Sequence, residues 1–163
     1  MGYTLRAFVG RAEALNPLVG VVPQAVLVKL EQGFFLIPVM DELHDALNNF
    51  VQEESLLPFY FLTAHIETQI LARIGNERVG YIEAEYFGGH GEQAAILWED
   101  GRREFVAGPD YGAINSVLKR LGATIGSSHH DEFEAVGLTL NRHTENWLPA
   151  YCCYAPPGAG ARL

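Results

Sequence analysis

The segment from Val79 to Val106 constrains the fold more than any other part of this sequence. It predicts three consecutive β-strands, joined first by the glycine-rich residues Gly88–Gly91 and then by Asp100-Gly101. Apolar residues alternate with Glu83 and Glu85 in the first strand, a period of two that is typical of a sheet with one packed face. Asp-Gly favours a tight hairpin because both central residues readily take positive φ. The segment therefore predicts a three-stranded antiparallel unit.

The rest of the chain carries shorter strand patterns and amphipathic helix patterns. Strand patterns are apolar runs bounded by turn residues, whereas helix patterns place apolar side chains three or four residues apart behind a capping residue. The predicted strands cover residues 3–9, 25–30 and 34–39, and the predicted helices begin at Asp41, Thr63 and Asp110 and extend to Val51, Ile74 and Leu121.

Clusters of strands with helices between them indicate the α+β class. We expect a mainly antiparallel sheet with about three helices packed on one face. A chain of 163 residues is expected to form one domain with one core. We place that domain at residues 1–154, because residues 155–163 have the composition of a flexible tail.

The chain is acidic, with a formal net charge of −9. Nucleic acids and anionic membranes require a basic surface, so neither is expected as a partner. Opposite charges accelerate association, so a cationic protein is the favoured partner. An acidic surface that serves solubility alone explains the charge equally well. A homo-oligomer is compatible with the sequence.

The two cysteines, Cys152 and Cys153, are adjacent in the sequence. A disulfide between neighbours is strained, so we expect reduced thiols. The first residues lack the apolar core of a signal peptide, and no apolar run approaches the roughly 20 residues of a membrane span. These features predict a cytoplasmic protein.

Two patterns suggest a ligand, but both lack the necessary context. Residues 89–94 match G-x-G-x-x-A, yet strand-like residues follow where a dinucleotide site needs a helix. His129, His130, Asp131 and Glu132 are contiguous, and adjacent side chains on an extended chain point apart. A solvated acidic loop is the favoured interpretation, so neither a cofactor nor a metal is expected.

Catalytic patterns are equally incomplete. No nucleophile elbow surrounds a serine. Glu83 and Glu85 share a strand face and would suit acid–base chemistry at the right separation, but strand carboxylates two residues apart are more often a solvated face. We therefore do not expect an enzyme.

The favoured site is a surface for binding a partner. Carboxylates and aromatics flank the glycine loop, and exposed aromatics with acidic neighbours are good interface anchors. The glycines themselves also suit a purely structural wide turn. The candidate partner-binding residues are Glu83, Glu85, Tyr86, His90 and Glu92, with Asp131 and Glu132 as a second acidic contact.

Two segments resemble a group of small bacterial proteins. Residues 81–101, YIEAEYFGGHGEQAAILWEDG, resemble the pattern aromatic-Gly-Gly-x-Gly-x-Gln-(Ala/Ser)-Ala-x-x-Trp, and residues 131–147, DEFEAVGLTLNRHTENW, resemble the C-terminal element of the same group. Residues 108–122 fit its asparagine-containing helix. These proteins are similar to immunity proteins that accompany polymorphic or contact-delivered toxins. The resemblance implies an inhibitor of a cognate toxin and supplies no catalytic residues.

The alternative is a small enzyme or ligand-binding module that uses the Gly88–Gly91 loop and the neighbouring carboxylates. The shape of the site distinguishes the two functions. A deep pocket with convergent polar groups favours the enzyme or binding module, whereas a convex acidic face favours the inhibitor.

Overall fold

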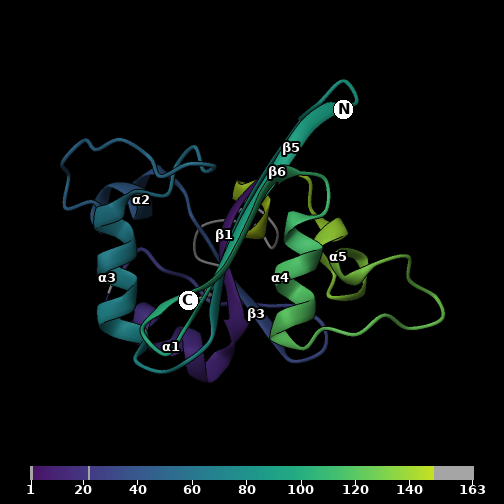
Figure 1. Cartoon of the computed structure of the whole chain (residues 1–163), viewed down its shortest axis with the longest axis horizontal. Coiled ribbons are helices and arrows are strands. Elements are labelled where there is room, and N and C mark those ends of the chain that lie inside the picture. The colour runs from purple at the N-terminus through teal and green to yellow at the C-terminus, as the bar shows by residue number, and fades with distance from the viewer. Residues whose placement is uncertain (1, 22, 149–163) are drawn as a thin grey trace, which may run out of the picture.

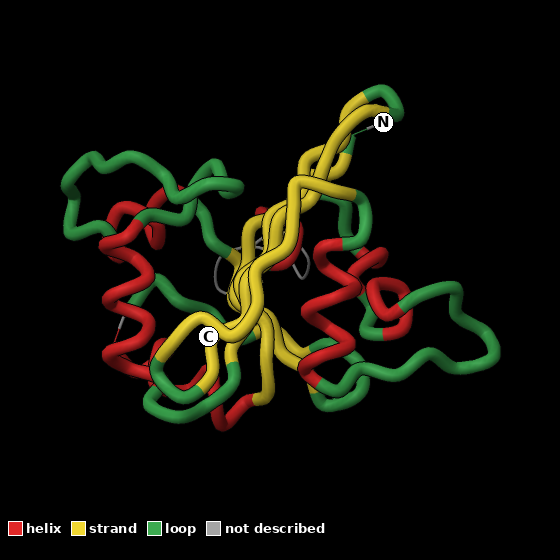
Figure 2. The backbone as a smooth tube through the Cα atoms, in the orientation of Figure 1, coloured by secondary structure: helices red, strands yellow, loops and turns green. Residues whose placement is uncertain are grey.

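A six-stranded antiparallel sheet lies between two layers of helices (Figures 1 and 2). The structure is a computed structural model that describes residues 2–21 and 23–148. The strand order is β2-β3-β1-β4-β5-β6. The strands are β1 (Tyr3–Arg11), β2 (Val28–Lys29), β3 (Phe34–Pro38), β4 (Val79–Phe87), β5 (His90–Glu99) and β6 (Arg102–Asp110). The helices are α1 (Ala12–Val21), α2 (Asp41–Leu47), α3 (Ala64–Ile74), α4 (Ala113–Leu121) and α5 (Glu132–Ala135), followed by the 3₁₀ turns η1 (Leu138–Leu140) and η2 (Thr144–Trp147).

The α+β class and the antiparallel sheet are as predicted, but the helices cover both faces of the sheet rather than one. The first core cluster joins α1, α2 and α3 to one face, and the second joins α4 and α5 to the other. Consecutive residues of β4 show the reason: Tyr81 belongs to the first cluster and Ile82 to the second, and both are buried. Each strand of the centre therefore has two apolar faces.

The predicted three-stranded unit is confirmed. Phe87 pairs with His90 across a two-residue turn, so His90 and Gly91 belong to β5 and the loop is shorter than the predicted Gly88–Gly91. The second turn is Asp100-Gly101, with φ values of 55° and 76°. Both central residues have positive φ, as the Asp-Gly pair predicts.

The predicted helices are partly correct. The Thr63 hydroxyl accepts a hydrogen bond from the Ile66 amide at 3.1 Å and caps α3. The first predicted helix is too long, because α2 ends at Leu47 and Phe50 lies beyond it with positive φ and 77% exposure. Asp110 is not the cap of α4; it is the last residue of β6, where its carboxylate accepts a hydrogen bond from the Gly112 amide.

The C-terminal part of the described chain completes the sheet at β1. β3 pairs only with the second half of β1, from Ala7 to Arg11. In the first half of β1, Thr4 forms a parallel bridge with His143 instead. The Thr144 hydroxyl accepts a hydrogen bond from the Arg6 amide at 3.1 Å and donates one to the Thr4 carbonyl at 3.3 Å. This places η2 beside the start of β1.

Within residues 2–21 and 23–148, no helix combines the length and the apolar character needed to cross a membrane. Cys152, Cys153 and the predicted tail at 155–163 lie outside the described residues.

Candidate functional site

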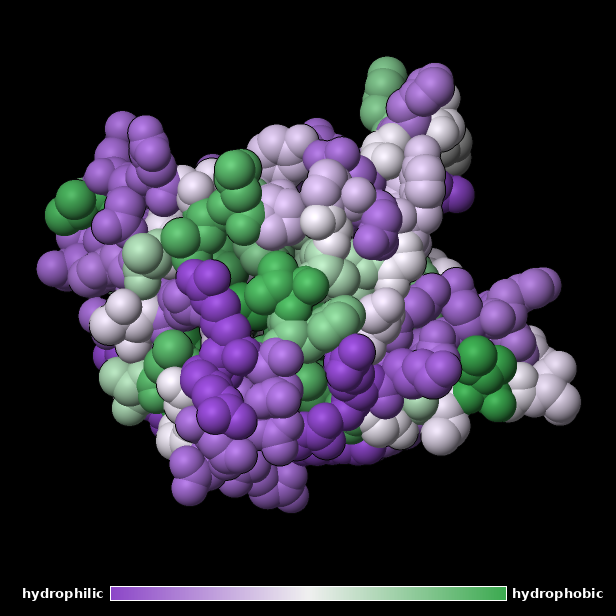
Figure 3. All heavy atoms as spheres, in the orientation of Figure 1, coloured by the Kyte–Doolittle hydropathy of each residue, from purple (hydrophilic) through white to green (hydrophobic). Residues whose placement is uncertain are grey.

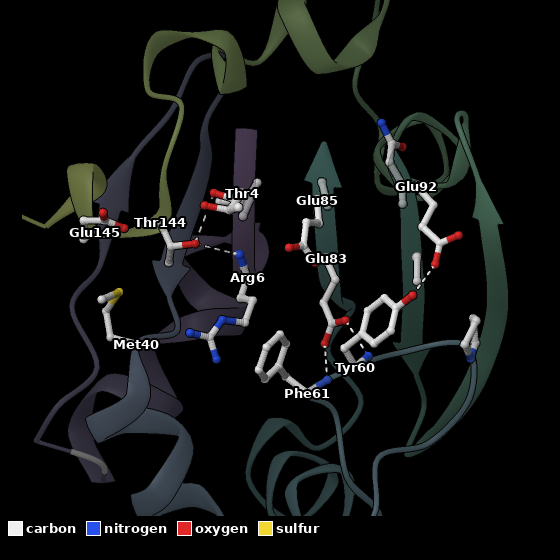
Figure 4. A pocket seen from close by; sticks show the side chains of 15 residues that line it. Thr4, Arg6, Met40, Tyr60, Phe61, Glu83, Glu85, Glu92, Thr144 and Glu145 are labelled. Atoms are coloured by element: carbon white, nitrogen blue, oxygen red, sulfur yellow. Dashed lines mark hydrogen bonds between the residues drawn. The ribbon is translucent and has the colours of Figure 1, made fainter. Parts of the chain in front are cut away.

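A cavity of about 240 Å³ lies over β1, β4 and β5, on the sheet face that also carries α1, α2 and α3 (Figure 4). Its walls come from these three strands, from the loop before α3, from Met40 just before α2, and from η2. The residues that line it are Thr4, Leu5, Arg6, Met40, Pro58, Tyr60, Phe61, Glu83, Ala84, Glu85, Glu92, Gln93, Ala94, Thr144 and Glu145. Four of these residues are glutamates and one is an arginine, so the lining is acidic.

Glu83 forms the floor of the cavity and is only 4% exposed. Its carboxylate accepts hydrogen bonds from the Tyr60 and Phe61 amides at 2.8 and 2.9 Å and from the Tyr81 hydroxyl at 2.8 Å. Burial, together with the Glu83 charge, raises the pKa of the Tyr81 hydroxyl well above its ordinary value. The three donors hold the loop against the sheet through Glu83. The structure therefore places this predicted partner-binding residue in a buried position, bonded within the protein.

Glu85 and Glu92 are the carboxylates that remain open to a ligand. They occupy directly opposite positions on β4 and β5, so their side chains project from the same face. Glu92 accepts a 2.6 Å hydrogen bond from the Tyr60 hydroxyl, which raises the pKa of that hydroxyl. The Glu85 side chain is exposed and forms no hydrogen bond or ion pair within the described part of the chain.

Arg6 lines the opposite side of the cavity, and its charge is used within the protein. Its guanidinium lies 4.0 Å from the centre of the Phe61 ring and 3.3 Å from a carboxylate oxygen of Asp41. In Figure 4 its nitrogens point away from Glu83, although the two residues are cross-strand partners. One nitrogen, Nη1, is buried and has no hydrogen-bond partner among the described residues. Arg6 therefore does not neutralise Glu85 or Glu92.

The two segments that carry the family resemblance meet at this cavity. Residues 81–101 contribute the strand carboxylates, and residues 131–147 contribute Thr144 and Glu145 from η2. Thr144 is buried by its two bonds to β1, and Glu145 is half-buried. The fold thus brings sequence-distant parts of the resemblance to one site.

The remaining predicted site residues on the hairpin are not part of the cavity. Tyr86 lies on the opposite sheet face from Glu85, where its ring stacks on Tyr111 with centroids 5.9 Å apart. Burial raises the pKa of its hydroxyl. His90 is exposed at the tip of the hairpin, opposite Phe87. Tyr86 and the strand carboxylates therefore lie on different faces of the sheet, because successive strand residues project to opposite faces.

Asp131 and Glu132, the predicted second acidic contact, lie apart from the cavity. Both lie at α5, which packs on α4 at the other face of the sheet. The Asp131 carboxylate accepts hydrogen bonds from the Glu134 amide and from the Asn115 side chain, and therefore caps α5. Glu132 is 8% exposed. Asp131 thus has a structural role as the cap of α5, and Glu132 is buried within the same helix.

Sequence reasoning missed the residues that close the cavity. Tyr60 and Phe61 look like core aromatics in the run Phe59-Tyr60-Phe61, yet they are 59% and 38% exposed. Arg6 has no distinctive local pattern, and Glu145 lies within the segment 131–147 that carries the resemblance but was not singled out. The place of both residues at the cavity depends on tertiary packing of the loop and of η2.

The histidines and acids of the described chain do not form a metal centre. No group of three or more histidine, cysteine or acidic side chains within residues 2–21 and 23–148 is placed to hold a metal ion. His130 instead approaches Glu134. The His130 main-chain amide donates to the carboxylate at 2.8 Å and Nδ1 lies 3.0 Å from it; the amide bond first, and then the ring contact, lower the pKa of Glu134.

No protein-family model, curated protein or solved structure matches this chain. The geometry of the cavity is therefore the main guide to function.

Proposed function

We propose that the protein is an acidic binding protein whose cavity receives a cationic group from a protein partner. The observation that carries this proposal is the pair Glu85 and Glu92, which line the cavity and have no ion-pair partner among the described residues. A partner that supplies a positive charge relieves their mutual repulsion and gains charge-assisted hydrogen bonds.

The surroundings of the cavity suit a protein partner. Tyr60 and Phe61 are exposed aromatics at its rim, and Leu57 in the same loop is 91% exposed. Figure 3 shows hydrophobic side chains gathered along the middle of one face, with hydrophilic side chains on both flanks. Apolar anchors surrounded by polar groups are the usual composition of a protein interface.

The finer proposal is an immunity protein that occludes the active site of a cognate toxin. Its supports are the net charge of −9 and the resemblance of residues 81–101 and 131–147 to small bacterial proteins similar to immunity proteins. A cytoplasmic location belongs to the same proposal, because an immunity protein must meet the toxin inside the cell it protects.

The immunity proposal expects a large toxin-bearing polypeptide to be encoded directly upstream, and the test measures binding to the C-terminal domain of that polypeptide. Replacing Glu85 and Glu92 together by lysine leaves two like charges opposite each other, so the fold is retained while the cavity becomes basic. We expect the association rate to fall by at least about tenfold and to lose its dependence on salt. The matched control is Glu77→Lys with Glu104→Lys, which makes the same charge change at exposed positions outside the cavity.

Surface-binding kinetics at several salt concentrations give the readout, and circular dichroism confirms that both double variants fold. Equal losses in the two variants mean that net charge alone, and not the cavity, governs association. Absence of binding by the wild-type protein contradicts the immunity proposal.

The second candidate is a ligand-binding module or small enzyme that acts on a cationic metabolite. The cavity itself favours it, because the polar groups of Tyr60, Glu85 and Glu92 converge there on a concave surface. Its carboxylates lie at the third residue pair from the turn of the β4–β5 hairpin rather than in the Gly88-Gly89 turn itself. Differential scanning with a panel of amines and guanidines distinguishes it: stabilisation by a small molecule in the absence of any protein partner favours this candidate.

A further inference from the structure

We infer that the cavity is a receptor for one alkyl-guanidinium group, held between the carboxylates of Glu85 and Glu92. The inference deepens the proposed function and rests on it for the source of the ligand, an arginine side chain of a protein partner.

The carboxylates of Glu85 and Glu92 are unfavourably arranged in the absence of a cation. Directly opposite residues on antiparallel strands have Cβ atoms about 4.5–5.5 Å apart, and like charges there are destabilising. Glu85 and Glu92 occupy such positions. No arginine, lysine or histidine among the described residues forms an ion pair with either. A cation between them converts a repulsive pair into an attractive site.

The charged groups beside this pair are engaged within the protein. Glu83 accepts three hydrogen bonds, and the guanidinium of Arg6 contacts Asp41 and the Phe61 ring. Glu145 on η2 also lacks an ion pair among the described residues, but Glu85 and Glu92 lie directly opposite each other, so an entering cation meets two carboxylates there. In Figure 4 the Glu92 carboxylate turns toward the Tyr60 hydroxyl, whereas the Glu85 carboxylate turns toward β1, so the two groups border the cavity from different directions.

The size and lining of the cavity indicate the chemical class of the cation. The cavity of about 240 Å³ is far larger than a metal ion, and the described residues offer no metal-binding group of three acids or histidines. Part of the lining is apolar, with Met40, Pro58 and Phe61, and suits an alkyl stem. A guanidinium has five donors in one plane and bonds two carboxylates at once, whereas an ammonium is a compact point charge. Planarity also allows stacking on the exposed face of Tyr60.

The experiment titrates the full chain with Nα-acetyl-L-arginine amide by isothermal calorimetry. Nα-acetyl-L-citrulline amide is the neutral, nearly isosteric comparison, and Nα-acetyl-L-lysine amide tests the ammonium. We expect saturable 1:1 binding of the arginine probe, at least about tenfold tighter than either comparison, since one charge-assisted bond contributes about that factor.

Single variants locate the site. Glu85→Gln and Glu92→Gln each remove a charge with little change of shape, and each is expected to weaken the arginine probe about tenfold. Glu77→Gln, an exposed carboxylate outside the cavity, is the matched control and leaves affinity unchanged. Equal binding of the citrulline probe, stronger binding of the lysine probe, absence of binding, or indifference to Glu85→Gln and Glu92→Gln overturns the inference.

Failure of this inference differs from failure of the proposed function. If the partner binds and the Glu85/Glu92 reversal weakens it while the arginine probe does not bind, the guanidinium receptor is wrong and the acidic interface stands. If the arginine probe binds with the expected variant pattern while no protein partner does, the receptor stands and the immunity function fails.

Discussion

Glu83 is a buried carboxylate that has no cation as a hydrogen-bond partner; its three recorded donors are two main-chain amides and a phenol. Such an arrangement fixes the backbone that supplies the amides. The loop at Tyr60 and Phe61 is thereby tied to β4, and the cavity depends on that connection.

Replacing Glu83 by glutamine is expected to destabilise the protein by about 2–3 kcal/mol, because the new NH₂ group faces main-chain donors and leaves a buried amide unsatisfied. Urea unfolding measures the free energy. Glu85→Gln is the control: it lies two residues away on the same strand face, is exposed, and should change stability by less than about 0.5 kcal/mol. Similar effects of the two changes contradict the structural role of Glu83.

At this scale the sequence has limited predictive value. Glu83 and Glu85 are two residues apart on one strand face and appear equivalent in the sequence. Their different burial is set by the backbone of Tyr60 and Phe61, more than 20 positions away. The acidic character of the site was predictable from strand periodicity, but its division into a structural and an open carboxylate required the tertiary structure.

Among the elements, the β4–β5 hairpin explains most of the glycine motif. Tyr86 and Gly91 are directly paired, and a Cβ on Gly91 would overlap the Glu85 carbonyl oxygen and lie 2.6 Å from both the Tyr86 Cα and its ring. The motif therefore reflects close packing of an aromatic residue over a glycine. This explanation is independent of any ligand.

Gly91→Ala is expected to disrupt the hairpin more than Gly88→Ala. Overpacking at Gly91 costs about 3 kcal/mol, whereas Gly88 has positive φ but open space around it, so alanine there costs about 1 kcal/mol. Hydrogen exchange of the main-chain amides in residues 85–92 detects local opening, and thermal unfolding detects any global effect. Equal protection in the two variants shows that the clash is relieved by a small shift.

Glu67 of α3 joins the helix to strands β5 and β6 through hydrogen bonds and an ion pair. Its carboxylate accepts hydrogen bonds from the Trp98 ring nitrogen at 2.8 Å and from two nitrogens of Arg103 at 2.6 and 2.8 Å. Burial acts to raise the pKa of Glu67, but the bonds from Arg103 and Trp98 outweigh it, and the net pKa lies below its ordinary value.

This lowered pKa predicts an acid-dependent contribution to stability. A carboxyl group whose pKa is lower when folded stabilises the protein above its unfolded pKa, and the contribution disappears as pH falls through the folded pKa. The stability difference between wild type and Glu67→Gln should therefore shrink between about pH 6 and about pH 3. Urea unfolding across this range measures it, and a difference that is constant with pH contradicts the ionised state of Glu67.

Elements with strong local signals were predictable. The Asp-Gly turn, the Thr63 cap and the apolar period of α3 each follow from neighbouring residues. The predicted extension of the first helix through Phe50 and Val51 failed because helical spacing alone does not distinguish a buried stripe from exposed side chains of a loop. Asp110 failed as a cap because β6 continues to that residue.

Over the whole molecule, the sheet is covered on both sides because its central strands are apolar on both faces. The sequence-based expectation of one packed face came from the glutamates of β4, which are unusual among the residues around them: Tyr81, Ile82 and Ala84 are all buried. Glu83 and Glu85 therefore led to the prediction of helices on one face of the sheet, whereas helices cover both faces. The class of fold was predictable, whereas the distribution of helices was not.

The predicted domain of residues 1–154 is testable by truncation. A chain that ends at residue 154 should unfold at the wild-type temperature. A chain that ends at residue 141 loses Thr144 and its bonds to Thr4 and Arg6, together with buried Trp147, and should melt at least about 10 °C lower, since removal of a large buried side chain and its hydrogen bonds costs several kcal/mol. Calorimetry measures both; equal melting temperatures contradict an integral role for η2.

The central position of β1 has a consequence for the order in which the chain folds. One neighbour of β1 is β3, which follows closely in the sequence, but the other is β4, whose paired residues lie 69 to 83 positions later, and the bridge at His143 is later still. Contacts of such long sequence separation form slowly, because the loop must close before they stabilise anything. During translation one edge of this apolar strand therefore stays open until β4 has been made, and its start stays open until residues around His143 reach Thr4.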